Sequence, residues 1–452
     1  MTGETLRVAE YATSLRYTDL PPSVIERAKQ LVLDQLACQV GVSSKPWLKL
    51  AATYVIGLGG NPDATIVGSS QRTNAENAAF VNGAFGHGFE VDDAYPPGLI
   101  LPGAVIVPAA LAAAEREGRS GREFLLAVII GYDVMGRVGC ALSPTQLYRG
   151  FHPTSAAGPI GAAAAVGRLI GLDQSQMVNA LAISASHCGG LTECYKSGGE
   201  IKRYHSGIAA AAGIRSAGLA RLGLTGPSTV LEGPLGIRAM CDDFKPEALV
   251  DGLGAWHLVD RVWIKKYCNN GMLHAPLDAL QAIQSRRRFG VDDVQRIVVG
   301  SNRHAINEVG SIATPKDVFG LQFSIAHTLA MHLVYGDTGL RHYVEATLHD
   351  RQLADVAKRV SIETDSEIDR LFPQKVGGKV RLEFHDGSTE CETVEDARGT
   401  PGNPMSSGEL RDKIHRVASL VMAPERVDQL IAAVAAIDQQ DDLHGLTRVL
   451  AA

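Results

Sequence analysis

The chain has 452 residues, of which 45% are hydrophobic and 20% are charged, and its net charge at pH 7 is −6. This length is sufficient for two domains, and the charge balance shows no basic excess of the kind that binds nucleic acid. The seven cysteines are odd in number and form no CxxC pair. A disulfide framework or a zinc site is therefore not expected, and a reducing, cytoplasmic compartment is favoured.

No signal peptide and no membrane span are expected. The N-terminal segment carries acidic residues and has no apolar core, and no apolar run reaches the roughly 18 residues that a membrane span needs. The most apolar stretch, from Phe124 to Ile130, is far shorter.

The first half of the chain shows helical periodicity. After a helix entry at residues 19–23, where prolines occupy positions that need no N–H, apolar residues recur at helical spacing from Val24 to Ala37. Similar patterns predict helices at 46–58, 74–88, 103–116, 121–142, 155–171, 174–187, 205–223 and 227–239. Strand-like alternation is scarce before residue 255, so we predict an all-helical domain over residues 1–260.

The pattern changes after about residue 290. Strands are predicted at 294–300, 360–364, 379–384 and 389–394, and Asp386-Gly387 between the last two indicates a β-hairpin. With a helix at 321–335, this predicts a smaller α+β lid domain over residues 261–400. Helical periodicity returns afterwards, so residues 401–452 are assigned to the helical domain. The predicted fold class is mostly α, with a large all-helical domain built from both chain ends and an inserted α+β lid domain.

Two histidines stand at the starts of helices that are rich in alanine and glycine. His152 precedes one of these helices, and His205 begins the other directly after Lys202 and Arg203. Helix N-termini offer free N–H groups and partial positive charge, so two such ends brought together would form an anion pocket. Cations are unfavourable at a helix start, and an anionic ligand would offset that cost. The alternatives are closely packed core helices with incidental polar caps and a solvated, exposed helix start.

A second cluster lies in residues 82–93. If the helix at 74–88 continues through it, His87 and Glu90 share a face, and so do Glu90 and Asp93. A carboxylate beside a histidine can orient it and fix its tautomer for acid–base work. A capped helix end at the surface is the alternative. No HExxH-like spacing occurs, so no metal site is predicted.

The segment 263–274 contains Lys265 and Lys266, which could hold a carboxylate, and Cys268, which has no base beside it in the sequence. Two histidines, His327 and His332, lie on the apolar helix predicted at 321–335, where a histidine is more often a core residue. Phosphate-loop, dinucleotide-binding and nucleophile-elbow motifs are absent from the sequence, which argues against nucleotide enzymes and the common hydrolases. No cofactor is predicted.

At these segments the chain resembles the MmgE/PrpD family, which includes 2-methylcitrate dehydratase, cis-aconitate decarboxylase and iminodisuccinate epimerase. The resemblance covers essentially the whole chain and implies a helical domain with a smaller lid domain, a homodimer, a small anionic substrate and chemistry without a metal. It rests on five stretches in the order of the family: NGAFGHGFEVDDAY, YRGFHPTSAAGPIGAAAAVGRLIGLD, GGEIKRYHSGIAAAAGIRSAGLARLGLTGP, IKKYCNNGMLHAPLDAL and QFSIAHTLAMHLVYGD.

The resemblance assigns site residues and also shows where this chain departs from the family. The positions it implies are His152, Lys202, Lys265, Asp92, Asp93 and Glu90. A family histidine after the acidic motif falls on Ile100, a second histidine falls on Asn270, and a site tyrosine falls on His327. Because isoleucine cannot move a proton, these changes argue against cis-aconitate decarboxylation and point to His327 as a replacement acid–base group.

The predicted reaction is dehydration of a small hydroxy-di- or tricarboxylate. Isomerisation or epimerisation of a similar acid, decarboxylation, and carboxylate binding without catalysis are the alternatives. We assign His152 as general acid or base, Asp93 as its orienting partner or as a partner for the hydroxyl group, and Lys202 to charge stabilisation, with His327 as a further catalytic group. The predicted substrate contacts are Lys265, Asp92, Glu90, Arg203, His205, Lys266, Asn270, His274 and Tyr95.

Overall fold

The computed structural model describes residues 3–451. Contacts between Cα atoms divide the chain into two compact units. The first takes in the described residues of Met1–Thr192, Glu200–Val262 and Ser407–Ala452, and the second Glu193–Gly199 and Trp263–Ser406. The predominantly helical fold predicted from the sequence is confirmed.

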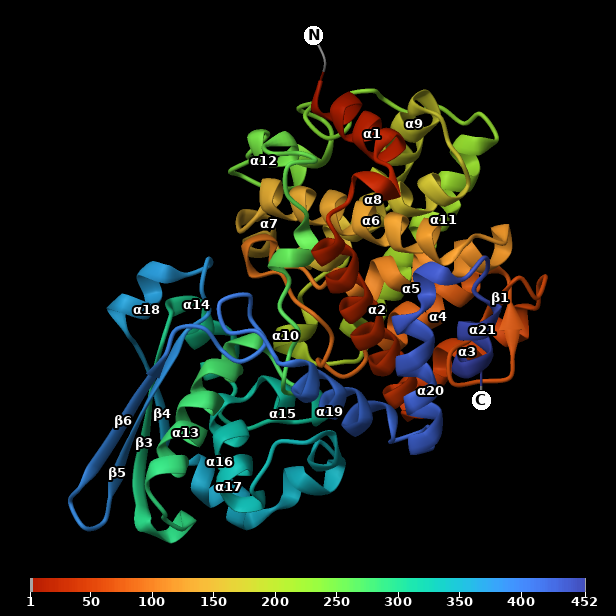
Figure 1. Cartoon of the computed structure of the whole chain (residues 1–452). Helices are drawn as coiled ribbons and strands as arrows, with labels where there is room; N and C mark the ends of the chain where they lie inside the picture. Colours follow the sequence, from red (N-terminus) through yellow and green to blue (C-terminus); the bar gives the residue numbers. More distant parts are fainter. Residues whose placement is uncertain (1–2, 452) are drawn as a thin grey trace. The chain divides into compact units, whose positions relative to one another are not determined.

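The first unit is built almost entirely of helices (Figure 1), and its two-residue strands β1 (Ala64–Thr65) and β2 (Arg72–Thr73) pair antiparallel. Its helices are α1 (Glu4–Ser14), α2 (Pro22–Val42), α3 (Pro46–Leu58), α4 (Ala75–Gly86), α5 (Gly103–Glu117), α6 (Gly121–Leu142), α7 (Thr145–Tyr148), α8 (Pro153–Leu169), α9 (Gln174–Ala185), α11 (His205–Arg221), α12 (Glu247–Val250), α19 (Ser407–Ala418), α20 (Pro424–Ala435) and α21 (His444–Leu450).

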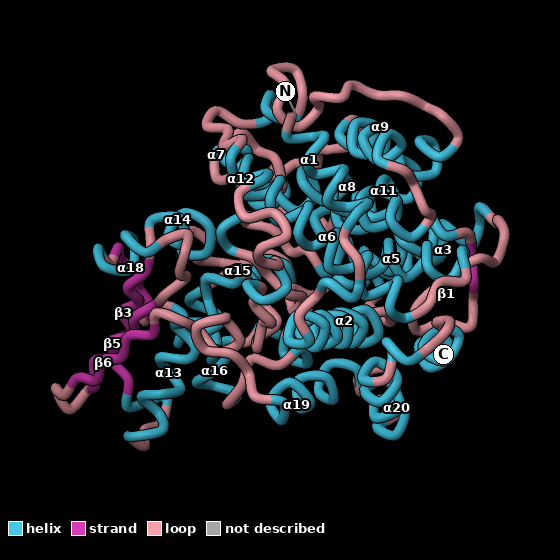
Figure 2. The backbone as a smooth tube through the Cα atoms, turned by 45° about the horizontal axis from the view of Figure 1, so that its top comes forward, coloured by secondary structure: helices cyan, strands magenta, loops and turns pink. Residues whose placement is uncertain are grey.

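Small residues let the central helices of this unit approach closely. Helix α8 packs between α6 and α11, and the three lie side by side in Figures 1 and 2. A Cβ atom added to Gly213 of α11 would lie 2.3 Å from the Cβ atom of Ala162 on α8, so a larger residue would force the helices apart. The Ala- and Gly-rich helices are therefore core helices, and their close packing fixes the positions of their first residues.

Helix α6 is also a core helix. By length and composition it could cross a membrane, contrary to the expectation that no apolar segment is long enough, and it is the one such helix among residues 3–451. Yet 94% of its apolar window is buried inside the unit. It also carries the buried carboxylate of Asp133, which accepts hydrogen bonds from Tyr11 and from the backbone N–H of Leu258.

Three local predictions were wrong. Residues 227–239 form a loop that ends in a 3₁₀ helix, η4 (Ile237–Met240), because glycines and prolines interrupt the apolar pattern. The helix predicted at 321–335 is two helices, separated at Ser324, whose side chain caps the second. The helix predicted at 74–88 ends at Gly86, so His87 and the residues after it lie in a turn rather than on a helix face.

The second unit contains a four-stranded sheet in the order β4-β3-β5-β6. Strands β3 (Val294–Ser301) and β4 (Val360–Thr364) are parallel, whereas β5 (Gly378–Phe384) pairs antiparallel with β3 and with β6 (Thr389–Val394). These strands match the four predicted ones to within two residues at each end, and Figure 2 shows β3, β5 and β6 side by side.

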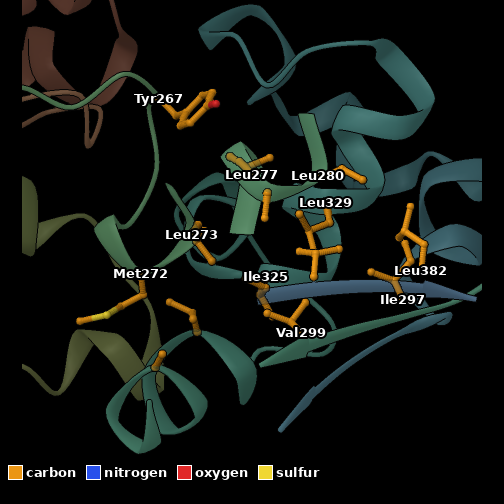
Figure 3. Packing of buried hydrophobic residues seen from close by; sticks show 14 of the residues in the cluster. Tyr267, Met272, Leu273, Leu277, Leu280, Ile297, Val299, Ile325, Leu329 and Leu382 are labelled. Carbon is orange, nitrogen blue, oxygen red and sulfur yellow. The ribbon is translucent and has the colours of Figure 1, made fainter. Parts of the chain in front are cut away.

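The helices of the second unit are α10 (Cys194–Ser197), α13 (His274–Arg286), α14 (Arg303–Ala305), α15 (Val318–Phe323), α16 (Ile325–Tyr335), α17 (Arg351–Ala357) and α18 (Ser366–Leu371). Of these, α13, α16 and α18 contact the strands of the sheet. Apolar residues of α13, α16, β3 and β5 interdigitate in one core, shown in Figure 3 with Leu277, Leu329, Ile297 and Leu382. Burial of these apolar side chains stabilises the second unit.

Candidate active site

The acidic turn after α4 brings a histidine to a carboxylate. His87 Nδ1 lies 2.8 Å from Oδ2 of Asp92, and neither side chain is exposed. Glu90, between them in the chain, has φ = 57°, a left-handed conformation that is unusual for a residue other than glycine. The prediction that Glu90 is the helical neighbour of His87 was therefore wrong, because the chain turns and presents Asp92 to His87 instead.

The starts of α8 and α11 meet at two histidines. His152 is the N-cap residue of α8 and His205 is the first residue of α11. Their Nδ1 atoms are 3.0 Å apart, and both side chains are buried. The ring of His87 stacks on that of His152, with centroids 5.7 Å apart and an interplanar angle of 24°. The two small-residue helix starts identified in the sequence thus lie together, with three buried histidines in a row.

Both histidines of this pair are neutral at pH 7. Burial lowers the pKa of His152 well below its ordinary 6.5, and the charges of Lys202 and the neighbouring histidines lower it further. Burial, His87 and Lys202 lower the pKa of His205 to about 4. A neutral imidazole carries one N–H, so one Nδ1 of the pair donates and the other accepts. The donor ring then has an unprotonated Nε2, and the acceptor ring has an Nε2–H.

The cations before α11 are buried and paired with the protein's own carboxylates. Lys202 lies in a 3₁₀ helix, η3 (Ile201–Tyr204), and forms an ion pair with Glu90. Arg203 pairs with Glu200 and donates to the carbonyl of Gly88 at 2.7 Å. The alternative of a solvated, exposed helix start was therefore wrong. Lys202, at 3% exposure, is instead a buried charge close enough to affect His152 and His205.

Asp93 has a different place from the one predicted. Its carboxylate accepts hydrogen bonds from the backbone N–H of Gly103, at 2.9 Å, and from the hydroxyl of Tyr132, at 2.7 Å. It therefore binds the first residue of α5, and within residues 3–451 its hydrogen bonds go to these two groups rather than to His152. Burial raises its pKa from 3.8 to about 7. The role of orienting partner for His152 is not supported by these contacts.

Tyr95 and Ile100 face each other across a short backbone bridge. The N–H of Tyr95 donates to the carbonyl of Ile100 at 2.8 Å, and burial raises the pKa of the Tyr95 hydroxyl, which lies 3.7 Å from Sγ of Cys140. Ile100 is 1% exposed and packs closely against Gly139 of α6. The position of the family histidine is thus filled by an apolar core residue.

The second unit holds the remaining predicted residues. Lys265 is buried, whereas Lys266 is bound within its own unit by Asp278, at 3.2 Å, and Gln281, at 3.0 Å, of α13. His274, the first residue of α13, is fully buried, and its ring meets those of neighbouring aromatic residues edge-on. These contacts fix Lys266 and His274 in the structure of this unit.

Asn270 and His327 belong to the same unit. Asn270 accepts a hydrogen bond from the N–H of Met272 and donates one to Glu308 at 3.1 Å, so it organises its own loop. His327 lies on the first turn of α16, half-buried, with Nδ1 3.0 Å from the hydroxyl of Ser324. Burial lowers the pKa of His327, which favours its neutral form.

Two residues of the first unit were not selected from the sequence. His87 was noted only as a partner for Glu90, although its place in the Gly86-His87-Gly88 sequence, directly after a helix, signals a tight turn. Tyr132 could not be recognised from the sequence as a partner of Asp93, because it lies 39 residues away in an apolar helix.

Among the residues that the structure describes, no group of three or more His, Cys, Asp or Glu side chains is arranged to hold a metal ion.

Comparison with known proteins identifies the class of protein. Residues 6–248 match the MmgE/PrpD N-terminal domain and residues 267–439 match the MmgE/PrpD C-terminal domain. The chain therefore belongs to the MmgE/PrpD family.

The curated relatives are enzymes named as decarboxylases, a class of lyase. Cis-aconitate decarboxylase of Aspergillus terreus (strain NIH 2624 / FGSC A1156) is 29% identical over 99% of this chain and 96% of its own length. The cis-aconitate decarboxylases of Mus musculus and Homo sapiens are each 27% identical over 96% of this chain, and the matches cover 91% and 92% of those proteins.

Proposed function

We propose that this protein is a metal-independent lyase that acts on a small di- or tricarboxylate. The observation that carries the proposal is the buried cluster of His152, His205 and Lys202 at the starts of two adjacent helices. Removing a proton next to a carboxylate requires a base, replacing a carboxyl group by a proton requires an acid, and fixed positive charge stabilises the intermediate in both reactions. The neutral histidine pair and Lys202 contain all three.

Each part of the cluster has a role in such a reaction. His152, with its pKa held below 6.5, is an unprotonated base at neutral pH. Lys202 and the N–H groups at the starts of α8 and α11 stabilise the negative charge that develops on the substrate carboxylate. The substrate would share Lys202 with Glu90, so we assign Glu90 the task of holding the lysine in place.

Dehydration is the reaction that we favour. Eliminating water needs a base for the C–H proton and an acid for the leaving hydroxyl, and the neutral histidine pair offers one unprotonated nitrogen and one N–H. The apolar Ile100 in place of the family histidine removes a proton donor that decarboxylation would use. Decarboxylation is the second candidate, because the curated relatives are named cis-aconitate decarboxylases.

The test is to incubate the purified protein in D₂O with 2-methylcitrate, citrate and cis-aconitate and to record proton NMR spectra and CO₂ release. Loss of a hydroxy acid with new alkene signals supports dehydration, and CO₂ release supports decarboxylation. Deuterium uptake without either change would indicate an isomerase or epimerase. A thermal shift with all three acids but no turnover would indicate a carboxylate-binding protein.

Variants and chelators complete this test. His152→Gln should abolish turnover, whereas His444→Gln, an exposed histidine on α21, should leave it unchanged. Activity that disappears in EDTA and returns with a divalent cation would contradict the metal-independent reaction.

We also propose a homodimer. Helix α3 exposes three large apolar side chains, Leu50 at 64%, Tyr54 at 63% and Leu58 at 60%. An apolar helix face of this kind marks an association surface. Light scattering coupled to size-exclusion chromatography should give about twice the mass of 48.0 kDa. Neither nucleic acid nor membrane is proposed as a partner.

A further inference from the structure

His205 is placed to take part in the reaction rather than only to bind substrate. Its hydrogen bond goes from ring to ring, with Nδ1 3.0 Å from Nδ1 of His152. The backbone of Gly190, at φ = 78°, lies close to His205, since an added Cβ atom there would lie 3.2 Å from Nδ1 of this histidine. The carbonyl of Gly190 also accepts a hydrogen bond from the backbone N–H of His152 at 2.8 Å. Gly190 therefore contacts both residues of the pair, the backbone of His152 and the ring of His205.

A neutral pair joined through its Nδ1 atoms has a defined proton arrangement. If one Nδ1–H donates to the other Nδ1, the donor ring is unprotonated at Nε2 and the acceptor ring is protonated at Nε2. The two Nε2 atoms are thus one base and one acid, joined by a single proton. When one Nε2 gains a proton and the other loses one, movement of the shared proton across the 3.0 Å hydrogen bond exchanges their roles.

We propose that His152 and His205 form a bifunctional proton relay in which both histidines are catalytic. The proposal rests on the proposed lyase function. In the forward step, Nε2 of one ring takes the proton next to the substrate carboxylate, and the C–H electron pair forms the C=C bond. That ring passes its Nδ1 proton to the second ring, whose Nε2–H protonates the departing hydroxyl as the C–O bond breaks. One water leaves, and both rings stay neutral.

The relay explains why neither histidine needs to carry charge during the reaction. Lys202 lies close enough to both rings to disfavour an imidazolium, and burial opposes it further. A single histidine acting as base would become an imidazolium beside this lysine, at a cost that the relay avoids. The pair ends with its tautomers exchanged. It is reset when water takes the proton from Nε2 of the first ring and gives one to Nε2 of the second, while the shared proton moves back between the Nδ1 atoms.

Nitrogen-15 NMR of histidine-labelled protein tests the arrangement without any substrate. At pH 7 the spectra should show one ring of the pair protonated at Nδ1 and the other at Nε2, with both neutral; His152→Gln and His205→Gln assign the signals. Two rings both protonated at Nε2, or an imidazolium in the pair, would overturn the relay whatever the enzyme acts on.

Kinetics test it on the reaction. The unfolding midpoint of His205→Gln should equal that of the control variant His444→Gln, whereas its kcat should be lower by about 10²-fold or more. A proton inventory in H₂O/D₂O mixtures should be curved for the native enzyme, because several protons move together, and linear for His205→Gln. Added imidazole should restore part of the activity of His205→Ala.

The activities of the two histidine variants distinguish a failure of the relay from a failure of the proposed function. If His152→Gln is inactive while His205→Gln keeps native kcat, His152 acts alone and the relay is wrong. If both variants turn over normally, the proposed active site is wrong as well.

Discussion

Lys413 and Asp34 form a buried ion pair with Nζ and Oδ1 2.5 Å apart, and each side chain is 1% exposed. Lys413 comes from α19 and Asp34 from α2, which are 379 positions apart in the chain (413 − 34) but pack against each other. The ammonium also donates to the carbonyl of Val91 at 2.9 Å, in the turn that carries Glu90 and Asp92. The C-terminal segment therefore holds the acidic turn in place.

Lys413→Met should destabilise the protein strongly. The substitution keeps the volume but leaves the carboxylate of Asp34 buried without its partner, which costs about 3–5 kcal/mol in comparable pairs. The double variant Asp34→Asn/Lys413→Met removes both charges and should recover most of this loss. Urea unfolding at pH 7 measures both changes. Equal stability of the single and double variants would show that the pair does not couple α2 to α19.

Lys202 should affect both stability and catalysis. Because Lys202 is buried against Glu90, Lys202→Ala removes this cation from a buried carboxylate and should lower stability as well as activity. This differs from the expectation for an exposed helix start, where only activity would change. Lys202→Met/Glu90→Gln removes both charges, so it should fold nearly as stably as the native protein while its kcat falls by about 10²-fold or more. Native turnover in the folded double variant would give Lys202 a purely structural role.

Asp93 should make the protein less stable as the pH rises. Its pKa is about 7 in the folded protein against 3.8 ordinarily, so between these values the folded state binds more protons than the unfolded state. The free energy of unfolding therefore falls from pH 4 to pH 7 by up to a few kcal/mol from this group. Asp93→Asn, which cannot ionise, should lose this slope. Unfolding midpoints of the two proteins at pH 5 and pH 8 measure it. If Asp93→Asn keeps the native dependence of stability on pH, a group other than Asp93 causes it.

The sequence predicted the parts of the fold that depend on local pattern. The strands of the second unit and the helices α3, α4, α5, α6, α8 and α9 follow from apolar periodicity and turn residues, and the two small-residue helices were each predicted with a histidine at the start. The partners of the acidic turn could not be predicted in this way. The pairs Asp93–Tyr132, Lys202–Glu90 and Lys413–Asp34 join distant segments, so only the packing of the helices determines them. The turn after Gly86, with its left-handed backbone at Glu90, likewise could not be predicted from periodicity.

His327 has a defined tautomer. The hydroxyl of Ser324 donates its one proton to the carbonyl of Ile312 at 2.7 Å, so it must accept from His327 Nδ1–H at 3.0 Å. Nε2 of His327 is then unprotonated, and burial lowers the pKa of the ring, so the neutral base persists at pH 7. The side chain is half-buried, and the apolar residues Ile325 and Leu329 of α16 form the core contacts of that helix. The structure therefore gives His327 the features of an oriented base.

We predict that His327→Phe folds normally and loses most of its turnover, with a pH optimum displaced from that of the native enzyme. Phenylalanine matches the ring in volume but cannot exchange a proton, so the unfolding midpoint should change little. The matched control is Ser324→Ala, which keeps the imidazole but frees its tautomer and removes the cap of α16; it should lose about 1 kcal/mol of stability and only part of its activity. Measuring kcat and KM from pH 5 to pH 9 for the native enzyme, His327→Phe and Ser324→Ala tests whether His327 exchanges a proton in the reaction. A fully active His327→Phe enzyme would return this histidine to a packing role and leave the acid–base chemistry to His152 and His205.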